Sequence, residues 1–464
     1  MNTPSPHPVL KRELGVFHAV LLGLGSILGT GVFVSIGIAA GIAGPSVLIA
    51  IVLAALLALC NGLSSAQLAA AHPVAGGTYE YAYQYLHPKL GFTAGWMFLL
   101  AKSASAATAA LGVSGMTIYL AGQFAGWYWI VGPIGIVLFV VLLVLTGIRR
   151  SAAVNALIVL FTLAGLLVFV IGGLFSLAQN QVISQNIEEV SRIESWPALI
   201  TATALMFVAY TGYGRIATLG EEVHDPKRTI PIAVIVTLVV CALLYISVGF
   251  VYSGAVQFLS FGGGGDLENR LIEATPLEAA AIWMQFPQWA RLLIAIAAIT
   301  AMLGVLLNLI LGLSRVLLAL GRRRDVPGIF EKVNAAGTTP VPAVIGVGVL
   351  IAGLTLIGDV KTTWSFAAFT VLIYYGITNL AALKLPKEYR LYPRVFSYAG
   401  LVGCLFLCGW VQPIVWMIGL GLIAVGLVWH QLAPTMFGVP PRQTEVCLQC
   451  GYDLRASTGN CPEC

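Results

Sequence analysis

The sequence predicts an all-α polytopic membrane protein, and three observations support this fold class. Of the 464 residues, 59% are hydrophobic and only 9% are charged, and the mean hydropathy is +0.92. Soluble globular domains carry about 25% charged residues, so this composition excludes a soluble domain. The apolar residues fall in segments of about 20, the length at which a helix crosses the hydrocarbon core of a bilayer. Two of these segments are interrupted by glycine near their middle.

Twelve apolar segments can be separated along the chain, and each is expected to form one transmembrane helix. The third and eighth exceed a bare span, so we expect them to be tilted or to project past the bilayer. The segments cover residues 16–36, 45–70, 93–121, 128–147, 152–176, 197–219, 231–255, 288–319, 341–358, 362–383, 395–412 and 414–433.

The distribution of Lys and Arg predicts the orientation of these spans. With the N-terminus inside, 18 of the 24 Lys and Arg residues fall in inner loops and termini, and four fall in outer loops. Because basic residues concentrate on the cytoplasmic side, we expect a multi-pass protein of the cell (inner) membrane with both termini cytoplasmic. The net charge of +5 then reflects loop placement, and no nucleic-acid partner is expected.

The first segment is interrupted by a glycine-rich stretch between Gly23 and Phe33. A membrane helix can lose its hydrogen-bond ladder only where the freed backbone groups face protein or a cavity. Glycine permits such unwinding and the close approach of a ligand. Gly25 and Gly29 also form a Gly-x-x-x-Gly face, which is typical of closely packed helix crossings. From this stretch alone, a broken helix and a close crossing both remain open.

The sixth segment has a similar interruption between Phe207 and Arg215, with aromatic and hydroxyl groups beside the glycines. Each interrupted segment begins a block of five spans. Because five is odd, the second block is inverted relative to the first. Glycine-interrupted segments at corresponding positions of two halves indicate a transporter site. We therefore expect a five-plus-five inverted repeat with discontinuous helices 1 and 6.

Four motifs resemble signatures of the amino acid–polyamine–organocation (APC) transporters. They are Gly29–Phe33 in the first segment, Pro73–Tyr79 after the second, Tyr210–Gly214 in the sixth and Glu221–Pro231 after it. The resemblance covers roughly residues 12–433 and looks closest to the branch of cationic amino acid transporters and their bacterial relatives. It implies a permease that moves amino acids across the membrane by alternating access.

The resemblance places the substrate where the two interrupted segments meet, and backbone groups there suit a zwitterion. N–H groups that begin the half-helix after Gly29 point at a carboxylate, and carbonyls that end the preceding half-helices accept from an ammonium. Ordinary packing is the alternative for the aromatic residues. No acidic residue lies beside the sixth-segment break, which favours neutral amino acids. The expected substrate-binding residues are Gly25, Ile27, Gly29, Thr30, Gly31, Phe207, Ala209 and Tyr210.

Five further residues are candidates for gating or coupling. Charges within spans are functional candidates by default, although Lys102 could instead snorkel or pair with a backbone carbonyl. Arg215 is expected to pair with Glu221 or Glu222 as an inner gate or structural clamp. By the resemblance, Thr162 falls where proton-coupled relatives carry a Lys, and threonine cannot titrate. Lost proton coupling, exchange, uniport and coupling to a small cation coordinated by hydroxyls and carbonyls therefore all remain open.

Residues 447–464 contain two Cys-x-x-Cys pairs separated by ten residues. This spacing matches a four-thiolate zinc site, and the tail resembles small zinc ribbons appended to some bacterial proteins. Because we expect the tail to be cytoplasmic, where disulfides are disfavoured, structural zinc is the expected cofactor. The expected ligands are Cys447, Cys450, Cys461 and Cys464.

These predictions divide the chain into an N-terminal segment (1–14), a transporter bundle (15–433), a linker (434–446) and the zinc-ribbon-like tail (447–464). The predicted function is a secondary active amino acid transporter, whose partners are a small-molecule amino acid and the lipid bilayer. The alternative is a transporter-like amino acid sensor that signals through its tail to a cytoplasmic partner. An enzyme is not expected, because the spans contain no acid–base constellation.

Overall fold

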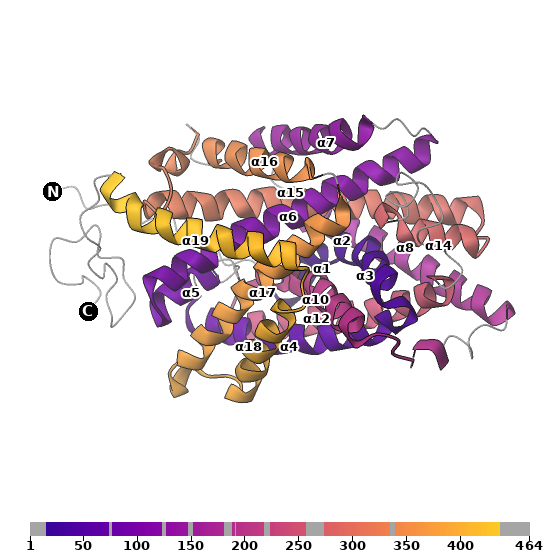
Figure 1. Ribbon diagram of the computed structural model, residues 1–464, viewed down its shortest axis with the longest axis horizontal. Coiled ribbons are helices and arrows are strands. Elements are labelled where there is room, and N and C mark those ends of the chain that lie inside the picture. The colour runs from indigo at the N-terminus through magenta and orange to yellow at the C-terminus, as the bar shows by residue number, and fades with distance from the viewer. Residues whose placement is uncertain are drawn as a thin grey trace.

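The structure is a computed structural model, and its regular elements are helices (Figure 1). It describes residues 15–73, 77–122, 127–146, 152–180, 188–190, 192–217, 223–256, 273–334, 339–357 and 359–436. The N-terminal segment and the four tail cysteines lie outside the described residues, as do Glu221 and Glu222.

The long helices follow the expected apolar segments closely, because each of them coincides with a run of apolar residues, whereas the short helix α5 is more polar and lies outside those segments. In the first part of the chain they are α1 (Val16–Ile27), α2 (Thr30–Phe33), α3 (Ser35–Ala43), the 3₁₀ helix η1 (Gly44–Ser46), α4 (Val47–Ala71), α5 (Thr78–Tyr85), α6 (Pro88–Ala121), α7 (Tyr128–Leu145) and α8 (Ala152–Gln179). In the second part they are α10 (Trp196–Tyr210), η2 (Thr211–Tyr213), α11 (Gly214–Ala217), α12 (Pro226–Val256), α14 (Pro276–Trp283), α15 (Gln288–Arg322), η3 (Gly328–Glu331), α16 (Val341–Thr355), α17 (Val360–Lys384), η4 (Lys387–Tyr389), α18 (Arg394–Cys408) and α19 (Pro413–Met436).

Eight of the described helices are long and apolar enough to cross a membrane, which makes this a polytopic membrane protein. Three shorter apolar helices accompany them, namely α1, α16 and α18. The stretch from Thr30 to Ala71 counts as one long span, because α2, α3, η1 and α4 follow one another without a loop. The expected excess length of the third and eighth segments is confirmed, since α6 has 34 residues and α15 has 35. The count of twelve spans stays a prediction.

The packing of the helices places the two interrupted segments in the interior. α1 contacts α8, α12 and α15, while α10 contacts α3, α4 and α17 (Figure 1). Around them, α4 packs on α12, α6 on α15 and α7 on α16. Large apolar side chains such as Leu157 and Ile171 are exposed on the periphery. This arrangement suits a bundle surrounded by lipid, where outward-facing apolar groups need no cover.

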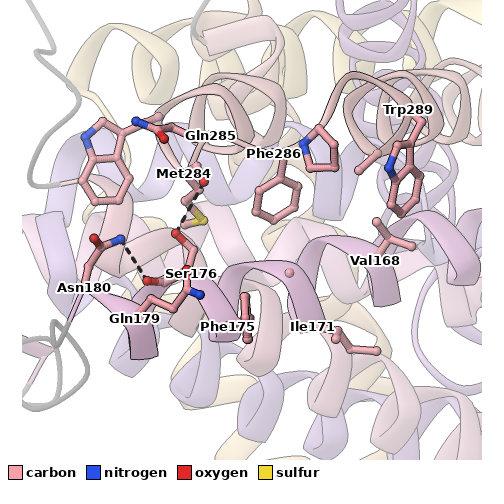
Figure 2. Close-up of a pocket in the computed structure, with 14 residues that line it drawn as sticks. Val168, Ile171, Phe175, Ser176, Gln179, Asn180, Met284, Gln285, Phe286 and Trp289 are labelled. Carbon is pink, nitrogen blue, oxygen red and sulfur yellow. Dashed lines mark hydrogen bonds between the residues drawn. The ribbon is translucent and has the colours of Figure 1, made fainter.

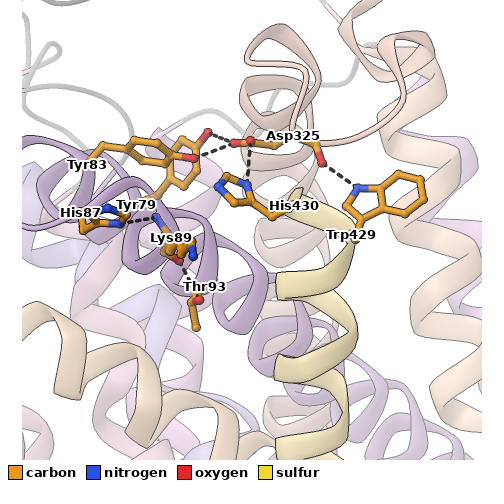
Figure 3. Close-up of polar contacts among 8 residues, drawn as sticks. All are labelled: Tyr79, Tyr83, His87, Lys89, Thr93, Asp325, Trp429 and His430. Atoms are coloured by element: carbon orange, nitrogen blue, oxygen red, sulfur yellow. Dashed lines mark hydrogen bonds and ion pairs between the residues drawn. The ribbon is translucent and has the colours of Figure 1, made fainter. Parts of the chain in front are cut away.

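A polar cluster ties three elements together at the end of the bundle that carries α5 (Figure 3). The buried Asp325, just after α15, accepts hydrogen bonds at Oδ2 from Tyr79 Oη (2.9 Å) and Tyr83 Oη (3.0 Å) of α5. From α19, His430 Nδ1 lies 3.4 Å from Asp325 Oδ1, and Trp429 Nε1 donates to the Asp325 carbonyl at 2.8 Å. Because α5, α15 and α19 are distant in sequence, this cluster fixes their relative positions.

The short helix α14 has proline in its first turn and lies at the opposite end of the bundle from α5 (Figure 1). It packs against α3, α8, α12 and α15. Its carboxyl group at Glu278 is 2% exposed, and burial raises the pKa of Glu278 to about 7 against the opposing effect of Arg291. The buried acid on α14 is therefore at this end of the molecule, away from its centre.

Candidate substrate site

The first interruption is a break in the helix. α1 ends at Ile27, Leu28 is extended (φ −75°, ψ 101°), and α2 begins at Thr30. A Cβ atom added at Gly29 would lie 2.5 Å from Val305 Cγ2 of α15, closer than real Cβ atoms approach. Glycine is needed because the backbone lies directly against α15. The broken helix and the close crossing, which the sequence left open, are both present.

The second interruption touches the first. α10 ends at Tyr210 and continues as the 3₁₀ turn η2 and then α11. A Cβ atom added at Gly212, in η2, would lie 2.4 Å from Ser26 O and 2.6 Å from Ile27 Cγ1. The backbone of η2 therefore packs on the last turn of α1 with no side chain between them. The two breaks differ in form, because the first contains extended residues and the second a tightened helical turn.

Tyr245 of α12 bridges the backbones of the two broken helices. Its Oη atom donates to the carbonyl oxygen of Ile27 at 3.0 Å and lies 3.3 Å from that of Ala209. These are carbonyl groups that the sequence indicated as acceptors for a substrate ammonium. The Tyr245 ring also packs on the ring of Tyr210, with centroids 4.9 Å apart. Sequence reasoning missed Tyr245, because one tyrosine in an apolar span carries no pattern that separates it from a packing residue.

The start of α2 offers backbone donors and a hydroxyl group. The first hydrogen bond of α2 runs from Val32 N to Gly29 O at 3.1 Å, so the N–H groups of Gly29, Thr30 and Gly31 precede the helical ladder. Thr30 is 3% exposed, and its Oγ1 atom has no hydrogen-bond partner among the described residues. A buried hydroxyl without a partner costs free energy, and a polar ligand at this position would satisfy it.

Aromatic side chains surround the second break. Phe207 is fully buried, and its ring meets that of Tyr375 of α17 edge to face, with centroids 5.7 Å apart. Tyr375 Oη donates to the carbonyl of Thr211 at 3.1 Å, and Tyr210 Oη donates to that of Ile51 at 3.4 Å. These rings give the region beside η2 an apolar wall with hydroxyl groups at its edge.

All eight residues expected to bind substrate are buried, and seven of them lie at the two breaks. The exception is Gly25, which packs against α8. A Cβ atom added there would lie 2.4 Å from Asn155 Oδ1, and Asn155 Nδ2 donates to Leu21 O at 2.9 Å. The structure therefore gives Gly25 a helix-packing environment. Asn155 was not singled out from the sequence, since a lone asparagine in a span has no distinctive spacing.

Lys102 of α6 reaches the second break. Its Nζ atom donates to Thr211 Oγ1 at 2.9 Å and to the Thr211 carbonyl at 3.3 Å, and the side chain is buried. Pairing with a backbone carbonyl, which the sequence left open, is thus the observed arrangement. Thr211 had no assigned role in the sequence analysis, and its contact with Lys102 joins α6 to η2.

Of the remaining gating and coupling candidates, Thr162 and Arg215 lie within the described residues. Thr162 is buried on α8, and its hydroxyl group donates to Ile158 O of its own helix at 2.7 Å. Arg215 lies on α11 with partial burial. Its expected partners, Glu221 and Glu222, are outside the described residues, so the proposed gate stays a prediction.

A cavity of about 820 Å³ lies elsewhere, between α8 and the segment that joins α14 to α15 (Figure 2). Its rim includes Phe175 and Trp289, which are 65% and 64% exposed. Two of its polar side chains have partners, because Asn180 Nδ2 donates to Ser176 O at 2.9 Å and Ser176 Oγ donates to Met284 O at 3.5 Å. None of the predicted site residues that the structure describes lines it. We assign this recess to the lipid-facing surface of the bundle.

Comparison with known proteins identifies the class to which this bundle belongs. The family model described as amino acid permease matches residues 18–444, and the chain therefore belongs to the amino acid permease family, a family of membrane transporters. The transporter expectation is confirmed at this level, and membership agrees with the expectation that the protein is not an enzyme.

Individual relatives carry transporter names. The chain is 34% identical to an uncharacterised transporter of Mycobacterium tuberculosis over 398 residues, which cover 86% of each chain. It is 28% identical to the branched-chain amino acid permease BcaP of Bacillus subtilis, covering 89% of this chain and 92% of the relative. It is 26% identical to the methylthioribose transporter of the same organism, covering 84% of each chain. These names do not favour the sensor alternative.

Substituting Gly31 by alanine is expected to impair transport, because the added Cβ would lie 2.6 Å from Tyr245 Oη and 3.0 Å from the Ala209 carbonyl oxygen. Overpacking of this kind costs about 1–3 kcal/mol, and the same cost borne by substrate binding corresponds to a loss of about 5- to 150-fold in affinity. Uptake by cells that express equal amounts of each protein measures the effect. Gly376→Ala is the control, since a Cβ there meets nothing within 4 Å. Equal uptake by the two variants would contradict this role for Gly31.

Proposed function

We propose that the protein is a secondary active transporter that moves amino acids across the cell membrane by alternating access. The observation that carries the proposal is the contact between the two broken helices, where Gly212 packs on Ser26 and Ile27. Family membership and the name of the branched-chain amino acid permease support an amino acid as the substrate.

The substrate would be held mainly by backbone groups at the two breaks. Its carboxylate would accept from the N–H groups at the start of α2, with Thr30 Oγ1 as a further donor. Its ammonium would replace Tyr245 Oη at the carbonyls of Ile27 and Ala209. This exchange substitutes one set of hydrogen bonds for another, so it leaves no buried carbonyl without a partner. Phe207 and Tyr210 would contact the amino acid side chain.

Alternating access would follow from the repeated architecture that the sequence predicts. Helices at corresponding positions of the two proposed blocks pack on one another, as α4 does on α12, α6 on α15 and α7 on α16. An inverted repeat of five spans places the two breaks near the middle of the bilayer. We propose twelve spans with both termini cytoplasmic. Arg215 and Glu221 or Glu222 would form the inner gate.

Transport by the purified protein in proteoliposomes tests this function. We expect vesicles loaded with an unlabelled amino acid to accumulate the labelled one by exchange, and we expect at least one of the twenty amino acids to raise the melting temperature. Methylthioribose is the comparison substrate, given the name of one relative. Accumulation of methylthioribose with no response to any amino acid would refute the assignment of amino acids as substrate.

For the tail, we propose a structural zinc ion bound by Cys447, Cys450, Cys461 and Cys464, supported by the two Cys-x-x-Cys pairs. Zinc contributes folding free energy to domains too small for a core. Full-length purified protein should contain about one zinc per chain, and Cys447→Ser with Cys450→Ser should remove it. Cys60→Ser, which changes a cysteine within α4, should not. A metal-free wild-type protein prepared without chelators would overturn the proposal.

A further inference from the structure

We propose that Lys102 determines the charge selectivity of the site, so that it accepts amino acids with uncharged side chains and rejects those with cationic ones. This inference rests on the proposed function and names the substrate class for it. The geometry behind it is a buried ammonium group held at the second helix break, one residue beyond Tyr210.

The hydrogen bonds around Thr211 show that Lys102 acts there as a donor. Thr211 Oγ1 donates its own proton to Val208 O at 2.7 Å, so it accepts from Lys102 Nζ. The Thr211 carbonyl accepts from Lys102 Nζ and also from Tyr375 Oη. An ammonium group has three donors and no acceptor, and it fits this pair of acceptors. The C-terminal end of α10 also carries the negative end of the helix dipole, which favours a cation.

No carboxylate balances Lys102 within the described part of the chain. Besides Lys102, three ionisable side chains of the acidic and histidine types are buried there, namely Glu278, Asp325 and His430. Glu278 lies on α14 at one end of the bundle, and the other two form the cluster beside α5 at the other end (Figure 3). The described ion pairs join Arg323 to Glu80 and His430 to Asp325. Among the described residues, the buried ammonium of Lys102 therefore has hydroxyl and carbonyl partners and no buried carboxylate beside it, while Arg215 lies partly buried on the following helix α11.

A resident charge in this position discriminates between substrates by their net charge. A zwitterion with an uncharged side chain adds no net charge to the site, whereas a lysine or arginine substrate adds a second positive charge. Like charges repel strongly where water is excluded and the effective dielectric constant is low. Such built-in repulsion is a common source of specificity. Tyr375, which shares the Thr211 carbonyl with Lys102, packs its buried ring on that of Phe207, and these two rings would suit an apolar substrate side chain.

This assignment separates the protein from the cationic amino acid transporters that its motifs resemble. Two of those motifs, Gly29–Phe33 and Tyr210–Gly214, lie at the two breaks, whose backbone would bind the carboxylate and the ammonium common to all amino acids. Lys102 lies on α6, outside the four motifs. Family membership therefore does not fix which charge the substrate side chain carries. Residues outside the motifs, such as Lys102, would determine that preference.

Competition measured in proteoliposomes tests the proposal. The labelled substrate is the neutral amino acid that exchanges fastest, and the competitors are unlabelled leucine and unlabelled arginine. For wild-type protein, we expect the concentration for half-inhibition to be about tenfold or more higher for arginine than for leucine, as two like charges in a poorly screened site require. In Lys102→Gln, which keeps a donor but removes the charge, this ratio should fall severalfold. Lys102→Arg should keep it.

One control variant and one alternative outcome separate specificity from structural support. Lys89→Gln removes a charge from the exposed start of the same helix and should leave the ratio unchanged. If Lys102 only supports η2, Lys102→Gln would weaken leucine and arginine equally and leave the ratio at the wild-type value, which would overturn the proposal. Should Lys102→Gln not fold, Lys102→Met is the second variant, and its arginine-to-leucine ratio should fall in the same way. Equal inhibition of wild-type protein by arginine and leucine would also overturn it.

The failure of this inference is distinguishable from that of the proposed function. If wild-type protein exchanges neutral amino acids but does not discriminate against arginine, only the role of Lys102 is refuted. If it exchanges no amino acid at all, the proposed function is refuted first.

Discussion

Inside a membrane, a backbone carbonyl that has no hydrogen bond within its helix must find a donor elsewhere in the protein, since lipid offers none. The centre of this molecule is organised by that requirement. The carbonyls of Ile27 and Ala209 meet the hydroxyl of Tyr245 from α12. The carbonyl of Thr211 meets Lys102 from α6 and Tyr375 from α17. Three surrounding helices thus supply the partners that let two others break at the same place.

These partners differ in how easily a ligand can replace them. The hydroxyl of Tyr245 is neutral and is shared between two carbonyls, so an ammonium can take its place without leaving either one unpaired. Lys102 is a buried charge bonded to two acceptors of one residue, and removing it from them would cost more. The hydrogen bonds of Tyr245 therefore suit a contact that breaks and re-forms during transport. Those of Lys102 suit a contact that persists and sets the charge of the site. At one end of the bundle, Asp325 holds α5, α15 and α19 together around this centre.

Much of the fold was predictable from the sequence because a bilayer leaves few alternatives. The lengths of the apolar segments predicted where the helices run. The glycines predicted where two of them break, at Gly29 and at Gly212. Proline marked the start of α14. Span counting was less secure, since α16 and α18 have only 15 residues each. Helix ends in such short elements depend on tertiary packing, which local sequence does not encode.

The candidate site was predictable only in part, and the reason is the distance in sequence between its members. The residues beside the breaks were identified because glycines interrupt the apolar segments there. The side chains that satisfy the breaks come from other helices. Lys102 lies 109 residues before its partner Thr211, and Tyr245 lies 218 residues after Ile27. A single tyrosine or lysine in an apolar span signals either packing or function, and only its position in the fold decides between them.

Hydrogen exchange of the backbone amides, with and without saturating substrate, tests the central claim most directly. If the two helix breaks hold the substrate, peptides that cover residues 26–33 and 207–214 should exchange more slowly in its presence, and the remaining spans should change less. Slower exchange in the segment between α14 and α15 beside the lipid-facing recess, with no change at the two breaks, would contradict the account.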